Sequence, residues 1–260
     1  MIVSRLPSTD HAAGPFAHVG NDAYGDLVST FVLIHGAWHG AWCWDRLVPQ
    51  LAERGHDTIA MDLPIDDASA TFETYADVVT RACGERADVV LVGHSLAGMV
   101  LPLVSARRQV RLQVFLCALI PNLSGKPWDD APPMGSPDYG NERDEDGTLV
   151  FRSPAAATAI FYADCRPEVA AWAYQRLRPF RNRSLWDRRY QLTEWPSVRS
   201  AAITCADDLA VYPDYQRVAL RDRLQVRPVE LPGHHSPFLA RPAVLADALV
   251  GLVGNRLTQK

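Results

Sequence analysis

The stretch VVLVGHSLAGMV at residues 89–100 places a serine between an apolar run and a run with helical spacing. The apolar run predicts a buried β-strand, and the residues after the serine predict a helix. Gly93 and Ala97 bracket Ser95, and Ala97 stands where this pattern usually has its second glycine. A sharp strand–turn–helix holds a serine hydroxyl clear of the sheet and presents helix N–H groups to a developing negative charge. The pattern favours a nucleophilic Ser95 over a serine that only caps a helix.

Apolar runs and helical patterns alternate on both sides of this stretch. Such alternation predicts an α/β fold with a mostly parallel, doubly wound sheet and helices on both faces. Thr71 is expected to cap the helix that follows it. Strands are expected at about 28–34, 56–63, 88–92, 111–119, 201–205 and 226–231, and helices at about 44–53, 71–87, 96–106, 214–224 and 242–253.

The alternation stops between about residues 122 and 196. Helical stretches are expected there at 154–162 and 167–177, without a strand that continues the rhythm of the sheet. An insertion of this size predicts a lid over one end of the sheet. We expect a single domain over residues 28–260, after a flexible leader at 1–27 that lacks the long apolar core of a secretory signal.

A serine hydroxyl needs a base to take its proton, and two late loops offer a base and an acid. His234 and His235 are adjacent in the loop after the last expected strand, and Asp207 and Asp208 are adjacent in the loop after the strand before it. The carboxyl ends of strands in an open α/β sheet meet at one edge, so both loops are expected near Ser95. The residues alone leave open which histidine and which aspartate act.

Four segments resemble the α/β-hydrolase superfamily, and within it the branch of plant-type methylesterases and hydroxynitrile lyases with their bacterial esterase relatives. The resemblance spans about residues 28–255, and its segments are FVLIHGAWHGAWCW (31–44), VVLVGHSLAGMV (89–100), ITCADDLAV (203–211) and LPGHHSPFLARPAVL (231–245). It implies the α/β-hydrolase fold. It also implies a catalytic triad of Ser95, Asp208 and His235, with an oxyanion hole formed by the N–H groups of Ala37 and Leu96.

Two departures from the resemblance disfavour lyase activity. Hydroxynitrile lyases of this branch carry a threonine where this chain has Gly36, and a lysine where it has Ser236. Without that lysine, a cyanide leaving group lacks its cation. Ser95 also excludes the aspartate nucleophile of epoxide hydrolases and dehalogenases.

Other residues near these motifs are candidates for the walls of a substrate pocket. The side chain of His35 is expected to bond backbone groups rather than substrate. Arginines between residues 176 and 189 are expected on a solvated helical face. The predicted pocket residues are Gly36, Trp38, His94, Trp128, Phe161 and Trp172.

Composition restricts the partners. The chain has 260 residues with 26 basic and 30 acidic side chains, a net charge of −4, which disfavours nucleic acid. The longest apolar runs, roughly ten residues, are too short to cross a bilayer. Five widely spaced cysteines without a CxxC pair argue against structural zinc and predict a reduced, cytoplasmic protein. No metal or cofactor is expected, and a homodimer is possible by analogy with the relatives.

The sequence therefore predicts a serine hydrolase that cleaves a carboxylic ester of a small to medium apolar molecule through an acyl-enzyme. One alternative keeps the triad for acyl transfer, lactone chemistry or cyclisation in a biosynthetic pathway. A second is a ligand-binding protein on a hydrolase fold, because one fold hosts many functions.

Overall fold

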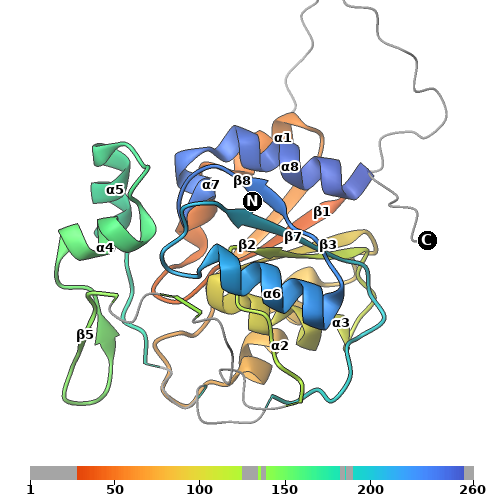
Figure 1. Ribbon diagram of the computed structural model, residues 1–260. Helices are drawn as coiled ribbons and strands as arrows, with labels where there is room; N and C mark the ends of the chain where they lie inside the picture. The colour runs from red at the N-terminus through yellow and green to blue at the C-terminus, as the bar shows by residue number, and fades with distance from the viewer. Residues whose placement is uncertain (1–27, 125–133, 136–138, 182–184, 186–189, 255–260) are drawn as a thin grey trace, which may run out of the picture.

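The computed structural model describes residues 28–124, 134–135, 139–181, 185 and 190–254 (Figure 1). Its centre is a parallel sheet with the strand order β2-β1-β3-β4-β7-β8. The expected mostly parallel sheet is confirmed. Its strands are β1 (Thr30–Ile34), β2 (Asp57–Met61), β3 (Val89–His94), β4 (Leu112–Leu116), β7 (Ser200–Cys205) and β8 (Val229–Leu231).

Helices cover both faces of the sheet, as the alternation predicts (Figure 1). Successive residues of β1 belong to different core clusters: Val32 packs in one and Leu33 in the other. Both side chains are fully buried, so each face of the sheet has its own apolar layer. One face carries α1 (Val48–Glu53), α7 (Pro237–Ala240) and α8 (Pro242–Gly254), and the other carries α2 (Phe72–Cys83), α3 (Leu101–Ser105) and α6 (Pro213–Leu224).

The order of the strands creates a topological switch point between β1 and β3. The chain leaves β1 for β2 on one side and returns to β3 on the other. Ile34 pairs with Gly93 in the register of β1 and β3. The residues that follow the two strands therefore emerge next to each other, at the edge where ligands bind in open α/β sheets.

Two expected helices are shorter than their patterns suggest. Thr71 caps α2 as predicted: its hydroxyl accepts the N–H of Thr74, and the Thr74 hydroxyl accepts the N–H of Thr71. The helix then ends at Gly84, whose φ of 55° lies outside the helical region. The helix expected at 96–106 is split into a 3-10 turn, η2 (Ser95–Met99), and α3, because Pro102 has no N–H for a continuous helical ladder.

A second split falls in the helix expected at 44–53, which forms a 3-10 turn, η1 (Ala41–Trp44), followed by α1. Pro49 lies at the start of α1, where its missing N–H costs nothing. Among the described helices, none combines the length and the apolar character needed to span a bilayer.

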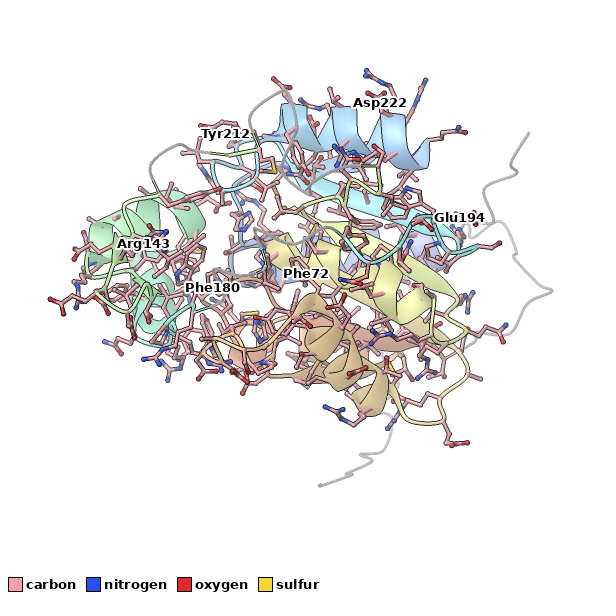
Figure 2. All side chains as sticks on the ribbon, turned by 90° about the horizontal axis from the view of Figure 1, so that it is seen from below. Phe72, Arg143, Phe180, Glu194, Tyr212 and Asp222 are labelled. Atoms are coloured by element: carbon pink, nitrogen blue, oxygen red, sulfur yellow. The ribbon has the colours of Figure 1, made fainter. Side chains whose placement is uncertain are left out.

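The described residues between β4 and β7 form an insertion at one end of the sheet (Figure 1). It holds a short antiparallel hairpin, which the sequence did not predict, and both expected helices. In Figure 2, Arg143 lies in the insertion and Phe180 lies at its inner side, toward the body of the protein. Its elements are β5 (Glu142–Arg143), β6 (Leu149–Val150), α4 (Pro154–Phe161) and α5 (Pro167–Tyr174).

Candidate active site

Ser95 lies at the turn between β3 and η2 with a φ of 55°, a left-handed conformation that a non-glycine residue rarely adopts. The neighbouring glycines explain how the turn is packed. A Cβ at Gly93 would lie 2.8 Å from the carbonyl oxygen of Ala97, and a Cβ at Gly98 would collide with the carbonyl oxygen of Leu119. Gly98 is a requirement that the G-x-S-x-G pattern missed, because its contact comes from the chain after β4.

Asp208 and His235 form a buried pair at the carboxyl ends of β7 and β8. Oδ2 of Asp208 lies 2.9 Å from Nδ1 of His235. Each residue is 1% exposed. Asp207 is exposed and His234 is half-buried, with no hydrogen bond to its Nδ1. Of the alternatives that the residues left open, Asp208 and His235 are thus the two that lie buried against each other.

His94 connects the serine turn to the histidine loop. Its Nε2 lies 3.0 Å from the carbonyl oxygen of His235, and the two rings are 4.4 Å apart between centroids. Burial lowers the pKa of His94 well below its usual value, so the ring is neutral. Because a carbonyl oxygen only accepts, the single hydrogen sits on Nε2. His94 was predicted to border the pocket. Because it directly precedes Ser95, its bond holds the backbone of His235 next to the serine turn.

The loop after β1 lies directly against Ser95. A Cβ at Gly36 would be 2.7 Å from Cβ of Ser95, so only glycine permits this approach. His35 donates from Nδ1 to the carbonyl oxygen of Gly36 at 2.8 Å, and its Nε2 accepts the N–H of Leu63 at 2.9 Å. Burial lowers the pKa of His35 to about 4, which keeps this ring neutral. The expected backbone-bonding role of His35 is confirmed.

The N–H of Ala37 belongs to the same peptide as the Gly36 carbonyl, so the bond from His35 also fixes the direction of that N–H. Leu96 is the second residue of η2, where helical N–H groups have no partner within the helix. In the part of the chain that the structure describes, neither the Ala37 nor the Leu96 N–H makes a hydrogen bond. Both remain available to an oxyanion.

Aromatic rings surround Trp38, which has a left-handed φ of 60° at a cost of about 1–3 kcal/mol. Phe161, from the end of α4, lies 5.8 Å from Trp38 and 5.8 Å from the ring of His235, between centroids. Trp172 lies farther out and packs on Trp42 at 5.4 Å. Trp128 lies outside the described residues. These pocket assignments remain predictions.

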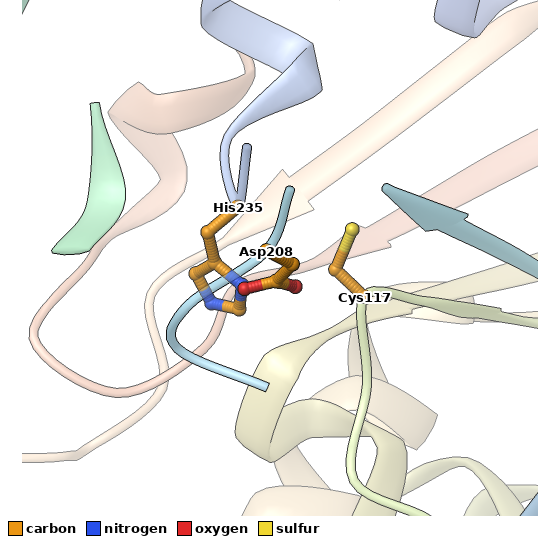
Figure 3. Close-up of side chains that lie close together, drawn as sticks. All are labelled: Cys117, Asp208 and His235. Carbon is orange, nitrogen blue, oxygen red and sulfur yellow. The ribbon is translucent and has the colours of Figure 1, made fainter. Parts of the chain in front are cut away.

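Cys117, which the sequence motifs did not single out, lies beside the buried pair (Figure 3). Its Sγ, an oxygen of Asp208 and a ring nitrogen of His235 lie within 4.8 Å of one another. A soft divalent cation accepts such donors. Burial, however, raises the pKa of the Cys117 thiol well above its usual value, so the sulfur keeps its proton. Asp208 and His235 already bond to each other, so a cation would have to displace two protons.

Comparison with known proteins assigns this chain to a family. The profile of the alpha/beta hydrolase family matches residues 31–248. The chain belongs to this family, which confirms the resemblance carried by the four motifs. Methylesterase 3 of Arabidopsis thaliana is 30% identical over 258 residues, which cover 86% of this chain and 95% of that protein.

Two further matches extend the comparison. Norfluorocurarine synthase 2 from a Strychnos species is 26% identical over 249 residues, which cover 85% of this chain and 93% of that protein. The crystal structure of polyneuridine aldehyde esterase superposes with a TM-score of 0.73 at 23% identity, and the match covers 87% of this chain and 99% of that one. At this identity the structural match establishes the shared fold.

Proposed function

We propose that this chain hydrolyses carboxylic esters of small to medium apolar molecules through a covalent acyl-enzyme. The observation that carries the proposal is the buried Asp208–His235 pair at the sheet edge where Ser95 occupies a left-handed turn. The similarity to plant methylesterases supports ester hydrolysis.

The triad residues and the two N–H donors have distinct roles in the proposed reaction. Ser95 Oγ attacks the ester carbonyl carbon while His235 accepts its proton. The N–H groups of Ala37 and Leu96 stabilise the oxyanion, where loss of one donor typically costs about 2.7–4 kcal/mol. His235 then protonates the leaving alcohol, and a water activated by the same ring releases the acid. Asp208 orients His235 and stabilises its charged form.

An apolar acyl group is supported by the rings gathered around Trp38. Aromatic side chains supply large apolar surfaces to ligand pockets. The rings within 6.4 Å of Trp38, between centroids, belong to Tyr139, Phe151, Phe161 and Phe180.

The proposal is tested by the hydrolysis of p-nitrophenyl esters of increasing acyl length by the wild type, Ser95→Ala and Ser124→Ala. Ser124 is an exposed serine whose hydrogen bonds among the described residues go to Asn122, so it is a matched control. We expect turnover in the wild type and in Ser124→Ala, and none above background in Ser95→Ala. A folded wild-type protein without turnover on any of these esters would refute the generic esterase.

The similarity to norfluorocurarine synthase 2 favours one second candidate, a biosynthetic reaction that uses the same triad. Product analysis in H₂¹⁸O separates the two candidates. Hydrolysis places one ¹⁸O atom in the released acid, because water opens the acyl-enzyme. Acyl transfer to another nucleophile, or cyclisation, gives a product without solvent oxygen.

We also propose a cytoplasmic location and no nucleic-acid partner. All five cysteines are free, and free thiols persist in reducing compartments. The net charge of −4 gives no reason for nucleic-acid binding. The possible homodimer stays a prediction, which sedimentation of the purified protein checks.

A further inference from the structure

A chain of buried hydrogen bonds joins the insertion to the loop after β1. The hydroxyl of Tyr162, the residue after α4, lies 2.9 Å from Nε2 of His39. Nδ1 of His39 lies 2.8 Å from the carbonyl oxygen of Ala37. Tyr162 is 0% exposed and His39 is 1% exposed. This series of hydrogen bonds ends at Ala37, whose N–H is the proposed oxyanion donor.

The direction of each bond follows from the chemistry of the groups. Burial lowers the pKa of His39 to about 3, so the ring carries a single N–H at neutral pH. The Ala37 carbonyl only accepts, which places that hydrogen on Nδ1. Nε2 must then accept, and Tyr162 is its donor because burial raises the pKa of the phenol. Without that hydroxyl, Nε2 would be a buried acceptor with no partner, and the ring would be free to change tautomer.

The insertion also holds the next residue of the loop. The N–H of Arg178 donates to the carbonyl oxygen of Trp38 at 2.7 Å, and Nε1–H of Trp38 donates to the carbonyl oxygen of Leu149 at 3.1 Å. Because Trp38 is left-handed, its conformation depends on such partners. The carbonyl oxygens of Gly36, Ala37 and Trp38 thus all accept hydrogen bonds. The donor to Trp38 lies in the insertion, and the donor to Ala37 is a ring that the insertion holds through Tyr162.

We propose that Tyr162, acting through His39, is a positioning residue for the oxyanion hole. The insertion then orients the Ala37 N–H in addition to forming a wall of the pocket. The proposal rests on the proposed esterase function. His35 fixes the peptide before Ala37 and His39 fixes the peptide after it, and together they set the direction of the Ala37 N–H. A misdirected N–H weakens binding of the transition state more than binding of the substrate, so the effect falls on kcat.

Tyr162→Phe tests the first bond, and Tyr174→Phe is its matched control. Tyr174 is also in the insertion, and its hydroxyl donates to the carbonyl oxygens of Arg152 at 2.8 Å and Phe151 at 3.3 Å; among the described residues, neither bond reaches the loop after β1. We expect Tyr162→Phe to lower kcat about tenfold or more with little change in KM. Affinity for a trifluoromethyl ketone, which forms an oxyanion with the serine, falls by a similar factor. Tyr174→Phe leaves all three quantities unchanged.

Two substitutions of His39 separate its two bonds. The amide nitrogen of His39→Asn takes the place of Nδ1 and keeps a donor for the Ala37 carbonyl. The amide of His39→Gln reaches the place of Nε2 and keeps only the contact with Tyr162. We expect His39→Asn to retain most of kcat and to be insensitive to a second change, Tyr162→Phe, whereas His39→Gln loses activity as Tyr162→Phe does.

The outcomes distinguish this inference from the esterase itself. If the wild type turns over esters and Tyr162→Phe behaves as Tyr174→Phe, the inference is wrong and the esterase stands. A change in Tyr162→Phe that lowers thermal stability but leaves kcat per folded molecule and ketone affinity intact also overturns it, because Tyr162 would then be only structural. If the wild type has no esterase activity, the proposed function fails and the inference fails with it.

Discussion

The carboxylate of Asp208 divides its two oxygens between His235 and the backbone. Oδ2 lies 2.9 Å from Nδ1 of His235, while Oδ1 accepts the N–H groups of Ala210 at 2.8 Å and Val211 at 3.0 Å. The backbone bonds fix the carboxylate plane before any substrate arrives. The orientation of the imidazole is therefore built into the loop after β7.

Asp208→Asn tests this orientation. An amide in place of the carboxylate keeps the shape of the loop, but it no longer stabilises a charged imidazole and favours the wrong tautomer. We expect kcat to fall by about 10⁴, the loss known for this substitution in a serine protease, with the fold intact. The neighbouring Asp207→Asn changes an exposed side chain and should leave kcat unchanged. Equal losses in the two variants would show that the acid has been misassigned.

Gly36→Ala tests the approach of the loop after β1 to Ser95, the proposed nucleophile. The added Cβ would stand 2.7 Å from Cβ of Ser95, so the loop must move away. A displacement of this kind is expected to lower kcat about a hundredfold. Gly251→Ala, on the exposed side of α8 with no atom within 4 Å of the new Cβ, is the control and should stabilise the protein by about 0.5–1 kcal/mol. Full activity in Gly36→Ala would place the oxyanion hole elsewhere.

His94→Gln and His94→Leu test the bond between the serine turn and the histidine loop. The amide of glutamine reaches the place of Nε2 and still donates to the carbonyl oxygen of His235, whereas leucine cannot. We expect His94→Gln to retain most of kcat and His94→Leu to lose about tenfold, because the carbonyl is left buried without that donor. Similar kcat values in both variants would mean that the ring acts only by packing.

The sheet and the positions of the loops proposed to be catalytic were predictable because each depends on a local signal. An apolar run identifies a strand, and the carboxyl ends of the strands meet at one edge, so the loops of Asp208 and His235 were expected near Ser95. The loop at Gly36 and Ala37 was expected there from the family resemblance, and the switch point that brings it to Ser95 is seen only in the strand order. The split of the helix after Ser95 was also present in the sequence as Pro102, whose missing N–H outweighs the helical spacing of its neighbours.

The detailed arrangement of side chains in the candidate site depends on contacts between residues that are far apart in the sequence. Residue types alone do not distinguish Asp207 from Asp208, since a one-residue step in a loop turns a side chain from solvent to the interior; only the resemblance of this segment to the α/β-hydrolases implied Asp208. The Tyr162–His39 bond joins residues 123 positions apart, and no spacing predicts it. Cys117 reaches the site because β4 lies between β3 and β7, which only the sheet order reveals.

The two neutral histidines of the loop after β1, His35 and His39, lead to a prediction about acid stability. The pKa of His35 is lowered to about 4 and that of His39 to about 3, against 6.5 in the unfolded chain, because both rings are buried. Between these values the unfolded chain binds more protons, so the contribution to stability is complete above pH 6.5 and is lost as the pH falls toward 4 and 3. Each histidine should thus remove about 2.5 kcal/mol of unfolding free energy between pH 7 and pH 4.5.

Urea unfolding of the wild type and His39→Asn at pH 7, 6, 5 and 4.5 measures this contribution. The wild type is expected to lose about 2.5 kcal/mol more than His39→Asn over that range, because the variant has one fewer group that gains a proton on unfolding. His234→Asn, which removes a half-buried histidine outside the loop, controls for the loss of a ring. Parallel pH profiles for the wild type and His39→Asn would show that His39 gains its proton at the same pH in the folded protein as in the unfolded chain, and the neutral buried ring inferred for His39 would then be wrong.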